Sequence, residues 1–505
     1  MKLKTLMLFA IAIAISTLVC AQKESAFLNV KDFGAKGDGI STDGTAINKA
    51  IDDAAAAGGG TIYFPAGNYL CGPLRLKNNI CLFISQGATL IASEDSSEFD
   101  APEKSVNDIY QDYGHSHWHN SFIWGENLHD ISILGTGKIW GKGLVRSGRK
   151  GDVRPNKAIS LLLCRNVIIK DVSILHGGWF AILATGVDNL TIDNLKVDTN
   201  RDGFDIDCCK NVRVSNCTVN SPHDDGICLK SSFGLGYVKA TENVTITNCQ
   251  VSGYDEGSLL DGTFKREDIK NDAPVGRIKF GTESNGGFKN ITITNCVFEY
   301  CSGLALETVD GALLEDVTIS NITMRDIGNS PIFVRIGARM RVPDTIPVGS
   351  CKRIIISNIV AYNVDYAQGA LIVGLPGHEI EDLQLSNIRI YYKGGGLKDS
   401  VNRDVPDNEK IYPEPERWKV LPSYGFYIRH VKNLKMHDVQ VSYMNDDYRP
   451  PFILDDVKGA IIYNVQAEKA AGASLFMLKN VQDIDIAKTA GVKDVFIRNS
   501  VRKDL

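Results

Sequence analysis

The stretch Asn-Val-Ile-Ile-Lys-Asp-Val at residues 166–172 is one copy of a phrase that recurs along the chain. The phrase returns as Asn-Leu-Thr-Ile-Asp-Asn-Leu at 189–195, as Asn-Val-Arg-Val-Ser-Asn-Cys at 211–217 and as Asn-Val-Thr-Ile-Thr-Asn-Cys at 243–249. Later copies begin at Asn290, Asp316, Arg353, Asp382, Asn433 and Gly459. Each copy alternates apolar and polar residues and then ends in a polar residue followed by an apolar one. This pattern is typical of a short β-strand that runs into a bend.

The spacing of the phrase decides the fold class. The closest copies begin about 22 to 26 residues apart, a period that predicts one structural unit per turn of a solenoid. Because no helical pattern separates the strands, we predict an all-β fold, a right-handed single-stranded parallel β-helix. Alternate Val, Ile and Leu side chains would then pack against the coils above and below. The short period and the number of copies disfavour a β-sandwich or a propeller.

The start of the predicted solenoid needs a cap, because an end coil would expose a row of apolar groups. Residues 44–54 carry apolar side chains at helical spacing, and the alanines and glycines that follow them end a helix. We therefore predict an amphipathic capping helix at the N-terminal end. Long loop inserts are expected at 98–120, 231–241, 253–276 and 394–424.

Residues 1–21 have the features of a secretory signal peptide: a basic start, a central apolar run and small residues before the cut. We expect this segment to be removed and residues 22–505 to form a single β-helix catalytic domain, exported to the periplasm or secreted. A buried N-terminal helix and a lipoprotein anchored through Cys20 are alternatives, although bulky Val19 disfavours the anchor. No other stretch is long and apolar enough to span a membrane.

Net charge and cysteine spacing indicate which macromolecules and metals the protein can bind. The net charge of −5 gives no bulk attraction for nucleic acid or an anionic polymer, so local Lys and Arg residues must bind any anionic ligand. We expect a monomer with no nucleic-acid partner. The twelve cysteines lack zinc-ligand spacing. Cys217, Cys249 and Cys296 each end a similar phrase, which predicts a stacked column of buried thiols rather than disulfides or a metal site.

The N-terminal third of the chain resembles known β-helix proteins. Asn-Val-Lys-Asp-Phe-Gly-Ala-Lys-Gly-Asp-Gly at 29–39, Thr-Asp-Gly-Thr at 42–45 and Gly-Thr-Ile-Tyr-Phe-Pro-Ala-Gly at 60–67 resemble the opening of pectin-lyase-like proteins. Gly-Thr-Gly-Lys-Ile-Trp-Gly-Lys-Gly at 135–143 is similar to a strand region of polygalacturonases, glycoside hydrolase family 28. The resemblance extends into the 460s. The opening phrase is shared by lyases, hydrolases, epimerases and phage tailspikes, so the middle of the chain must decide the function.

Two acidic clusters lie about one coil apart, within residues 200–207 and 223–231. Because neighbouring coils are about 4.8 Å apart, we expect Asp202, Asp224 and Asp225 to lie together on one face. Carboxylates packed this closely repel one another, so some of their pKa values must rise. A glycosidase uses such a pair as general acid and as the base that activates water, roughly 6.5–9.5 Å apart in inverting enzymes.

The polygalacturonase family has Asn-Thr-Asp and Gly-Asp-Asp at these two places. The resemblance implies that Asp224 is the general acid and that Asp202 and Asp225 hold and deprotonate the water. Asn200 would orient the site, and His223 would bind substrate beside it. Hydrolysis by paired carboxylates needs no metal, so we expect neither a metal nor another cofactor. Asp205 and Asp207 are explained equally well as residues that cap turns.

The chain departs from the family in the next two coils. The family often has Gly-His-Gly where this chain reads Val-Gly-Arg-Ile-Lys at 275–279, and Arg-Ile-Lys where this chain has Ala305 and Glu307. A glutamate repels a substrate carboxylate, so the sugar there is neutral or its carboxylate is bound elsewhere. Cations that could compensate, and thus bind substrate, are Lys230, Arg277, Lys279, Arg335, Arg339 and Arg341.

These features predict a glycoside hydrolase that cleaves α-galacturonosidic linkages in pectin by an inverting acid/base mechanism. The replaced cation pair favours rhamnogalacturonan, which alternates acidic and neutral sugars, and the inserts favour exo action on single sugars. Tyr110, Tyr113, His115, His117, Trp118 and His119 in the first insert either stack on sugars or pack on the helix wall. A Ca²⁺-dependent pectic lyase and a non-catalytic carbohydrate-binding β-helix are the alternatives.

Overall fold

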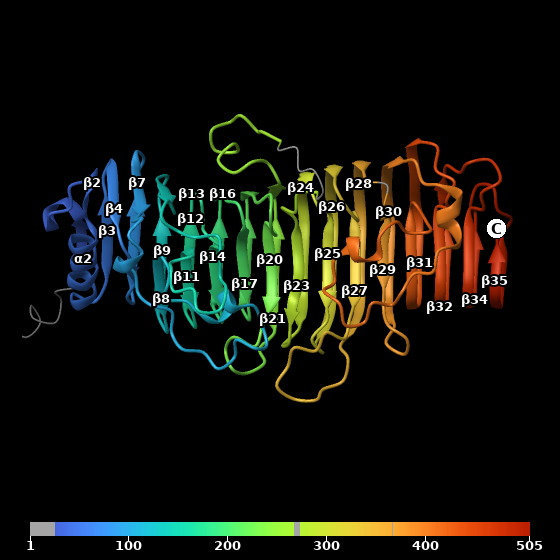
Figure 1. Ribbon diagram of the computed structural model, residues 1–505, viewed down its shortest axis with the longest axis horizontal. Coiled ribbons are helices and arrows are strands. Elements are labelled where there is room, and N and C mark those ends of the chain that lie inside the picture. Colours follow the sequence, from blue (N-terminus) through green and yellow to red (C-terminus); the bar gives the residue numbers. More distant parts are fainter. Residues whose placement is uncertain (1–25, 267–272, 366) are drawn as a thin grey trace, which may run out of the picture.

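The structure is a computed structural model that describes residues 26–266, 273–365 and 367–505. The predicted signal peptide, with Cys20, lies outside the described residues. The described chain winds into a parallel β-helix, as predicted. Its coils stack along the long axis of the molecule, with α2 (Gly44–Ala56) at one end and β35 (Val495–Asp504) at the other (Figure 1). No described helix is long and apolar enough to cross a membrane.

Each coil contributes up to three strands, and each strand pairs with the equivalent strand of the next coil. The first sheet contains β5 (Leu74–Arg75), β8 (Ile123–Glu126), β11 (Lys157–Leu162), β14 (Phe180–Thr185), β17 (Asp202–Asp207), β20 (Ile227–Ser231), β23 (Ile278–Ser284), β25 (Leu304–Thr308), β27 (Ile332–Ile336) and β29 (Ala370–Val373). The second contains β1 (Ala26–Asn29), β3 (Gly60–Phe64), β6 (Ile80–Ile84), β9 (His129–Leu134), β12 (Arg165–Lys170), β15 (Asp188–Asp193), β18 (Lys210–Ser215) and β21 (Thr241–Thr247).

The third sheet contains β2 (Asp38–Thr42), β4 (Gly67–Cys71), β7 (Ala88–Ala92), β10 (Lys138–Trp140), β13 (Ser173–Leu175), β16 (Lys196–Asp198), β19 (Thr218–Asn220), β22 (Gln250–Ser252) and β33 (Gln466–Ala467). In the C-terminal half, longer strands bend from one sheet into the next: β24 (Phe288–Cys301), β26 (Leu313–Ile327), β28 (Ser350–Val364), β30 (Ile380–Gly394), β31 (Phe426–Asn445), β32 (Phe452–Tyr463) and β34 (Phe476–Ala487). The last strand, β35, pairs with β34 in the antiparallel direction.

The recurring phrase forms the strands of the second sheet. In β18, Val212 and Val214 are buried in the core while Arg213 between them is exposed. The asparagine of each copy has a positive φ, 56° at Asn189 and 58° at Asn211, which asparagine tolerates better than most residues. The amide of Asn211 donates to Asn189 Oδ1 at 3.1 Å, and this ladder continues along neighbouring coils. The asparagines therefore fix the bend at the same point of each coil.

The N-terminal capping helix and the buried thiols are as predicted. In α2, the buried residues are Ile47, Ala50, Ile51 and Ala54, and the helix covers the N-terminal coil as expected. The described cysteines form no disulfides, and Cys217, Cys249 and Cys296 are buried thiols at equivalent positions of successive coils. Other described helices are the short 3-10 turns η1 (Val30–Phe33), η2 (Ser96–Glu98), η3 (Tyr113–Ser116), η4 (Lys398–Asn402) and η5 (Pro415–Trp418).

Candidate active site

Three aspartates meet where two coils of the first sheet turn into their strands. Asp202 begins β17, and Asp224 and Asp225 lie in the turn before β20, which pairs with β17 in parallel. One carboxylate oxygen of each residue lies within 4.8 Å of the others. The structure thus brings the predicted catalytic residues together, but closer than the expected 6.5–9.5 Å. The physical reason is that adjacent residues and adjacent coils supply them.

The three carboxylates differ in their access to solvent. Asp202 is 3% exposed and Asp225 is 2% exposed, whereas the side chain of Asp224 is 24% exposed. Asp224 lines a pocket of about 570 Å³. The other lining residues are Pro222, His223, Ala273, Val275, Ser302, Asn329, Glu414, Glu416 and Arg417. Asp224 is therefore the aspartate that a ligand in this pocket meets first.

Asp225 is held by two cations from the next coil. Arg277 Nε donates to Asp225 Oδ1 at 2.9 Å, and Lys279 Nζ lies 3.3 Å from Asp225 Oδ2. Burial raises the pKa of Asp225, but Lys279 and Arg277 outweigh burial and hold this pKa below its ordinary value. Asp225 is consequently an anion with both oxygens engaged.

Asp202 has the opposite electrostatic environment. Burial, followed by the charges of Asp224 and Asp205, raises the pKa of Asp202 well above its ordinary value, against the weaker effect of Lys230 and Arg201. Asp202 is therefore the member of the trio that keeps a proton. Neighbouring buried carboxyl groups whose pKa values are pushed apart are typical of a functional site.

Asp224 has a cation of its own. Arg201 donates from one terminal nitrogen to Asp224 Oδ2, and its guanidinium carbon lies 5.3 Å from the ring centroid of Trp179. Our sequence reasoning did not single out Arg201. The signal was available, because Arg201 stands where the polygalacturonase family has the threonine of Asn-Thr-Asp.

Arg277 and Lys279 are neutralised from two further directions. Glu414 Oε1 accepts from Arg277 at 2.7 Å and lies 3.3 Å from Lys279 Nζ. Glu307 Oε2 lies 3.9 Å from the same Lys279 nitrogen. Glu307 is fully buried, and burial raises its pKa to about 8. The expected repulsion between Glu307 and a bound carboxylate is therefore wrong, because the side chain lies beneath Lys279 and does not line the pocket.

Comparisons with known proteins find similarity over two parts of the chain and to one longer relative. Residues 27–125 match the family described as rhamnogalacturonase A/epimerase, pectate lyase-like, and residues 155–273 match the right-handed β-helix region. A probable polygalacturonase of Vitis vinifera is 24% identical over 413 residues, which cover 75% of this chain and 77% of that protein. Over these parts the chain is similar to pectin-lyase-like β-helix proteins.

Two further proteins are similar to the chain. An exo-poly-α-D-galacturonosidase of Dickeya chrysanthemi is 30% identical over 277 residues. The matched part covers 54% of this chain but only 40% of that relative. The structure of a family 28 exopolygalacturonase of Yersinia enterocolitica superposes with a TM-score of 0.64 and 17% identity, covering 88% of this chain and 78% of that chain. The structural likeness shows a shared fold.

Other residues that we predicted to bind substrate lie at varying distances from the pocket. His223 is exposed at the pocket, and its backbone N–H donates to the carbonyl of Asn200 at 3.1 Å. Lys230 is buried between Glu283, at 3.1 Å, and Asp205, at 3.7 Å. Lys230 thus supports the site from below and is not open to the pocket.

Arg335 and Arg339 serve the protein's own loops. Arg335 donates to the carbonyl oxygens of Gly374 and Asp407, at 3.2 and 2.7 Å. Arg339 donates to Asp310 Oδ1 at 3.0 Å. Neither arginine lines the pocket beside Asp224. Both side chains anchor loops of the first sheet, and the structure does not bring them to the predicted substrate.

The aromatic insert packs on the helix wall, which was one of the two alternatives. His115 is buried and its Nε2 lies 2.9 Å from Asp205 Oδ2. His117 stacks on Tyr113, with ring centroids 3.9 Å apart. Trp118 is buried in a small cluster with neighbouring apolar residues. None of these side chains lines the pocket beside Asp224.

Among the described residues, two groups of acidic and histidine side chains are close enough to share a cation. The first is the aspartate trio, where Arg201 and Arg277 already supply positive charge. The second consists of Asp112, His115 and Glu283. Here Arg341 bonds to both Asp112, at 2.9 Å, and Glu283, so a guanidinium occupies the place of a metal.

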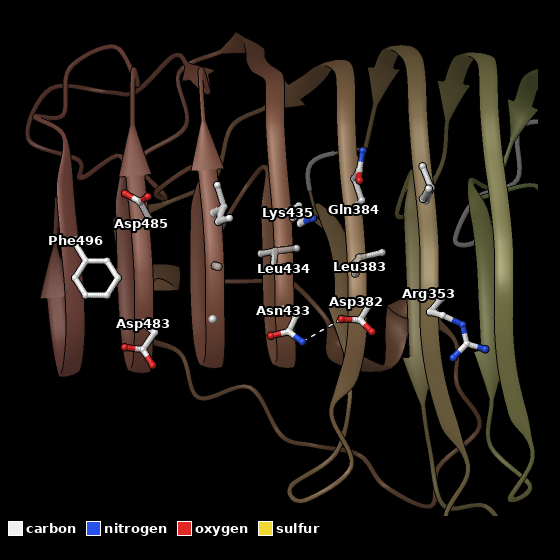
Figure 2. A pocket seen from close by; sticks show the side chains of 14 residues that line it. Arg353, Asp382, Leu383, Gln384, Asn433, Leu434, Lys435, Asp483, Asp485 and Phe496 are labelled. Atoms are coloured by element: carbon white, nitrogen blue, oxygen red, sulfur yellow. Dashed lines mark hydrogen bonds between the residues drawn. The ribbon is translucent and has the colours of Figure 1, made fainter.

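A second pocket, of about 780 Å³, lies over the C-terminal strands of the second sheet (Figure 2). Asn433 donates to Asp382 Oδ1 at 3.0 Å there, and Phe496 of β35 closes one side. None of the residues that we predicted to be catalytic or substrate-binding lines this pocket. The buried, ion-paired carboxylates place the candidate active site beside Asp224 instead.

Proposed function

We propose that this protein is a glycoside hydrolase that cleaves α-galacturonosidic linkages of pectic polysaccharide. The proposal rests on one observation: two neighbouring coils place Asp202, Asp224 and Asp225 within 4.8 Å of one another, in three different charge environments. One partly exposed carboxyl faces the pocket, and two buried ones lie behind it. Relatives named as polygalacturonases and a rhamnogalacturonase-type family match support the pectic substrate class.

We assign the roles from access and charge. Asp224 faces the pocket and donates a proton to the leaving oxygen as general acid. Asp202 and Asp225 hold the water and accept its proton. Each proton transfer of this kind contributes about 10²–10⁴-fold to the rate.

We propose inversion of the anomeric centre, even though the short carboxylate separation is closer to that of retaining enzymes. A retaining nucleophile needs a free oxygen, and Asp225 has Arg277 on one oxygen and Lys279 beside the other. Proton NMR of the first-formed product tests this directly. A product that keeps the α configuration would show that one of the aspartates attacks the sugar.

Rhamnogalacturonan is the substrate that the charges favour. On the side of the pocket lined by Glu414, this residue and Asp225 already neutralise Arg277 and Lys279. A neutral sugar fits that side better than a second galacturonate does. The test compares product release from rhamnogalacturonan and from polygalacturonate; faster turnover of polygalacturonate would refute the preference. An unsaturated product whose formation stops with chelator would identify a lyase instead.

The insert at 394–424 favours exo action. Glu414, Glu416 and Arg417 from this insert line the pocket, and Glu416 accepts from Asn329 Nδ2 at 2.9 Å. The insert therefore closes the pocket on one side. An exo-acting enzyme releases single small products from the first minutes and lowers viscosity slowly. Early production of a broad ladder of oligosaccharides would contradict this part of the proposal.

The place of action follows from the substrate. Pectic polymers are too large to enter a cell, and the signal peptide predicted at 1–21 would export the protein. We propose that the exported protein acts as a monomer in the periplasm or outside the cell. N-terminal sequencing of the exported protein and its elution volume on a sizing column test these two points.

A further inference from the structure

Arg201 is bonded to the carboxyl group of the proposed acid, Asp224. One terminal nitrogen of Arg201 bonds to Asp224 Oδ2, and the guanidinium lies 5.3 Å from the ring centroid of Trp179. Its Nε is buried and has no hydrogen-bond partner among the described residues. The side chain is nevertheless 33% exposed. Arg201 therefore has an aromatic surface behind it and donors that a ligand could use.

The contacts of Arg201 and Asp202 match the end point of the proposed reaction. Hydrolysis by the proposed route leaves Asp224 ionised, because it has given its proton to the leaving oxygen. The same step leaves the proton of the attacking water on Asp202. Two observations fit that end point: Arg201 is bonded to Asp224 Oδ2, and burial raises the pKa of Asp202. A new turnover requires the proton to return from Asp202 to Asp224.

We propose that a galacturonate carboxylate of the substrate draws Arg201 away from Asp224, and that this exchange returns the proton from Asp202 to Asp224. The inference rests on the proposed hydrolase function and adds Arg201 as the positioning residue that makes the reaction depend on an acidic sugar. The carboxylate would lie on the Trp179 side of the aspartates, one coil before Asp202. A guanidinium binds a carboxylate through two parallel hydrogen bonds, which suits Arg201 to this exchange.

The step conserves protons and involves no oxidation. The O–H bond on Asp202 breaks and an O–H bond forms on Asp224, whose nearest oxygen lies within 4.8 Å. Asp224 then protonates the leaving oxygen as the carbon–oxygen bond breaks. The water oxygen bonds to the anomeric carbon, and its proton goes to Asp202, which restores the starting state.

The other charged groups around Asp224 cannot replace Arg201. Arg277 and Lys279 are engaged by Asp225 and Glu414. The acidic groups on the pocket side repel a carboxylate and so favour its approach from the Trp179 side. The titratable and charged groups facing Asp224 from its own turn and the neighbouring elements are Arg201, Asp202, His223, Asp225, Arg277, Lys279, Tyr412, Glu414, Glu416 and Arg417.

The experiment compares wild type, Arg201→Met and Arg201→Lys on pectic oligosaccharides and on the same oligosaccharides after chemical reduction of their carboxyl groups. Wild type should prefer the acidic substrate by about 100-fold in kcat/KM, because a site built for a polar group rejects the analogue that lacks it. Arg201→Met should lose most of this preference, and Arg201→Lys should keep part of it. Arg266→Met is the matched control, since Arg266 stacks on Tyr300 at 4.6 Å and does not line the pocket.

The pH profile separates this role from a merely structural one. In free wild type, the charge of Arg201 lowers the pKa of Asp202, which carries the proton to be returned, so activity measured as kcat/KM is lost at a lower pH than it would be without the arginine. Arg201→Met should move the basic limb of kcat/KM up by about one pH unit and leave that of kcat in place. An unchanged preference for the acidic substrate, or an unmoved limb, would overturn the proposal.

If the hydrolase proposal itself fails, the result is different: wild type forms no product from any pectic substrate. Calorimetry then decides the role of Arg201 without turnover. Galacturonic acid should bind to wild type and not to Arg201→Met, while galactose binds to neither. Equal binding of galacturonic acid to both proteins, or no binding to wild type, would remove Arg201 as the carboxylate partner.

Discussion

Arg277 and Asp225 are 52 positions apart in the sequence, yet Arg277 Nε donates to Asp225 Oδ1 at 2.9 Å in the buried floor of the site. The pair forms because β23 stacks directly on β20, so that the two coils share one face. A buried carboxylate of this kind needs its cation, since removing one partner of a buried ion pair destabilises a protein by about 3–5 kcal/mol.

Arg277→Met should therefore lower the free energy of unfolding by about 3 kcal/mol at pH 7. The pKa of Asp225 lies below its ordinary value, so its ionisation stabilises the fold above the unfolded pKa and loses that effect as pH falls through the folded one. In the variant, Asp225 is protonated more easily and the deficit should shrink towards pH 4. Urea unfolding midpoints at pH 7 and pH 4 measure this, with surface Arg213→Met as control. A deficit that stays constant with pH would contradict the electrostatic account.

Asp224→Asn should fold as wild type does and lose nearly all hydrolysis, because an amide cannot donate the proton that the leaving oxygen needs. The expected loss in kcat is about 10²–10⁴-fold. Asp261→Asn, an exposed aspartate outside the trio, serves as the control. Initial rates of reducing-end release measure the effect. Retention of more than about a tenth of the wild-type rate would exclude Asp224 as the general acid.

The aspartate trio could be predicted from sequence because its spacing equals one coil. Once the phrase at 211–217 had shown the period, Asp202 and Asp224 had to lie on neighbouring turns. The thiol column followed from the same period, whereas the helix α2 followed from apolar residues at helical spacing. The contacts of the trio and of the thiols lie within one or two repeats, where the solenoid fixes the register.

The side chains that contact the buried and half-buried cations of the site could not be predicted in this way. Glu414 bonds to Arg277 across 137 positions, from an insert whose path no repeat dictates. Glu307 looked like a repulsive group in the site, because coil position alone does not reveal that Lys279 covers it. Arg201 was visible as a departure from the family phrase, but its link to Trp179 required the coordinates.

Glu307→Gln should stabilise the protein increasingly as pH rises from about 4.5 to 8. Burial raises the pKa of Glu307 to about 8, so the folded protein holds a proton that the unfolded chain has already lost in this window. Wild-type stability therefore falls with rising pH, by up to about 1.4 kcal/mol per unit, and glutamine removes this loss. Urea midpoints at pH 5, 6, 7 and 8 test it, with Glu381→Gln, whose side chain is 42% exposed, as control. A difference from wild type that is flat across these pH values would refute the buried, protonated Glu307.

Lys157→Met should change how the free energy of unfolding depends on pH above pH 7. Lys157 is fully buried, and its Nζ donates only to neutral acceptors, Asn120 Oδ1 at 3.1 Å and Asn156 Oδ1 at 2.6 Å. Burial lowers its pKa to about 7, only weakly opposed by Glu103. The unfolded chain thus binds more protons than the folded protein between about pH 7 and 10.5, and wild-type stability rises with pH across this window.

The stability of the methionine variant lacks this rise. The difference in free energy of unfolding between wild type and Lys157→Met should therefore shift in favour of wild type from pH 7 to 10 and stay constant below pH 6. Urea midpoints across pH 5–10 measure the gain, and exposed Lys196→Met should follow wild type throughout. If Lys157→Met kept the wild-type slope above pH 7, Lys157 would be charged in the folded protein. The two asparagine carbonyls would then be sufficient to hold a buried ammonium group without a carboxylate.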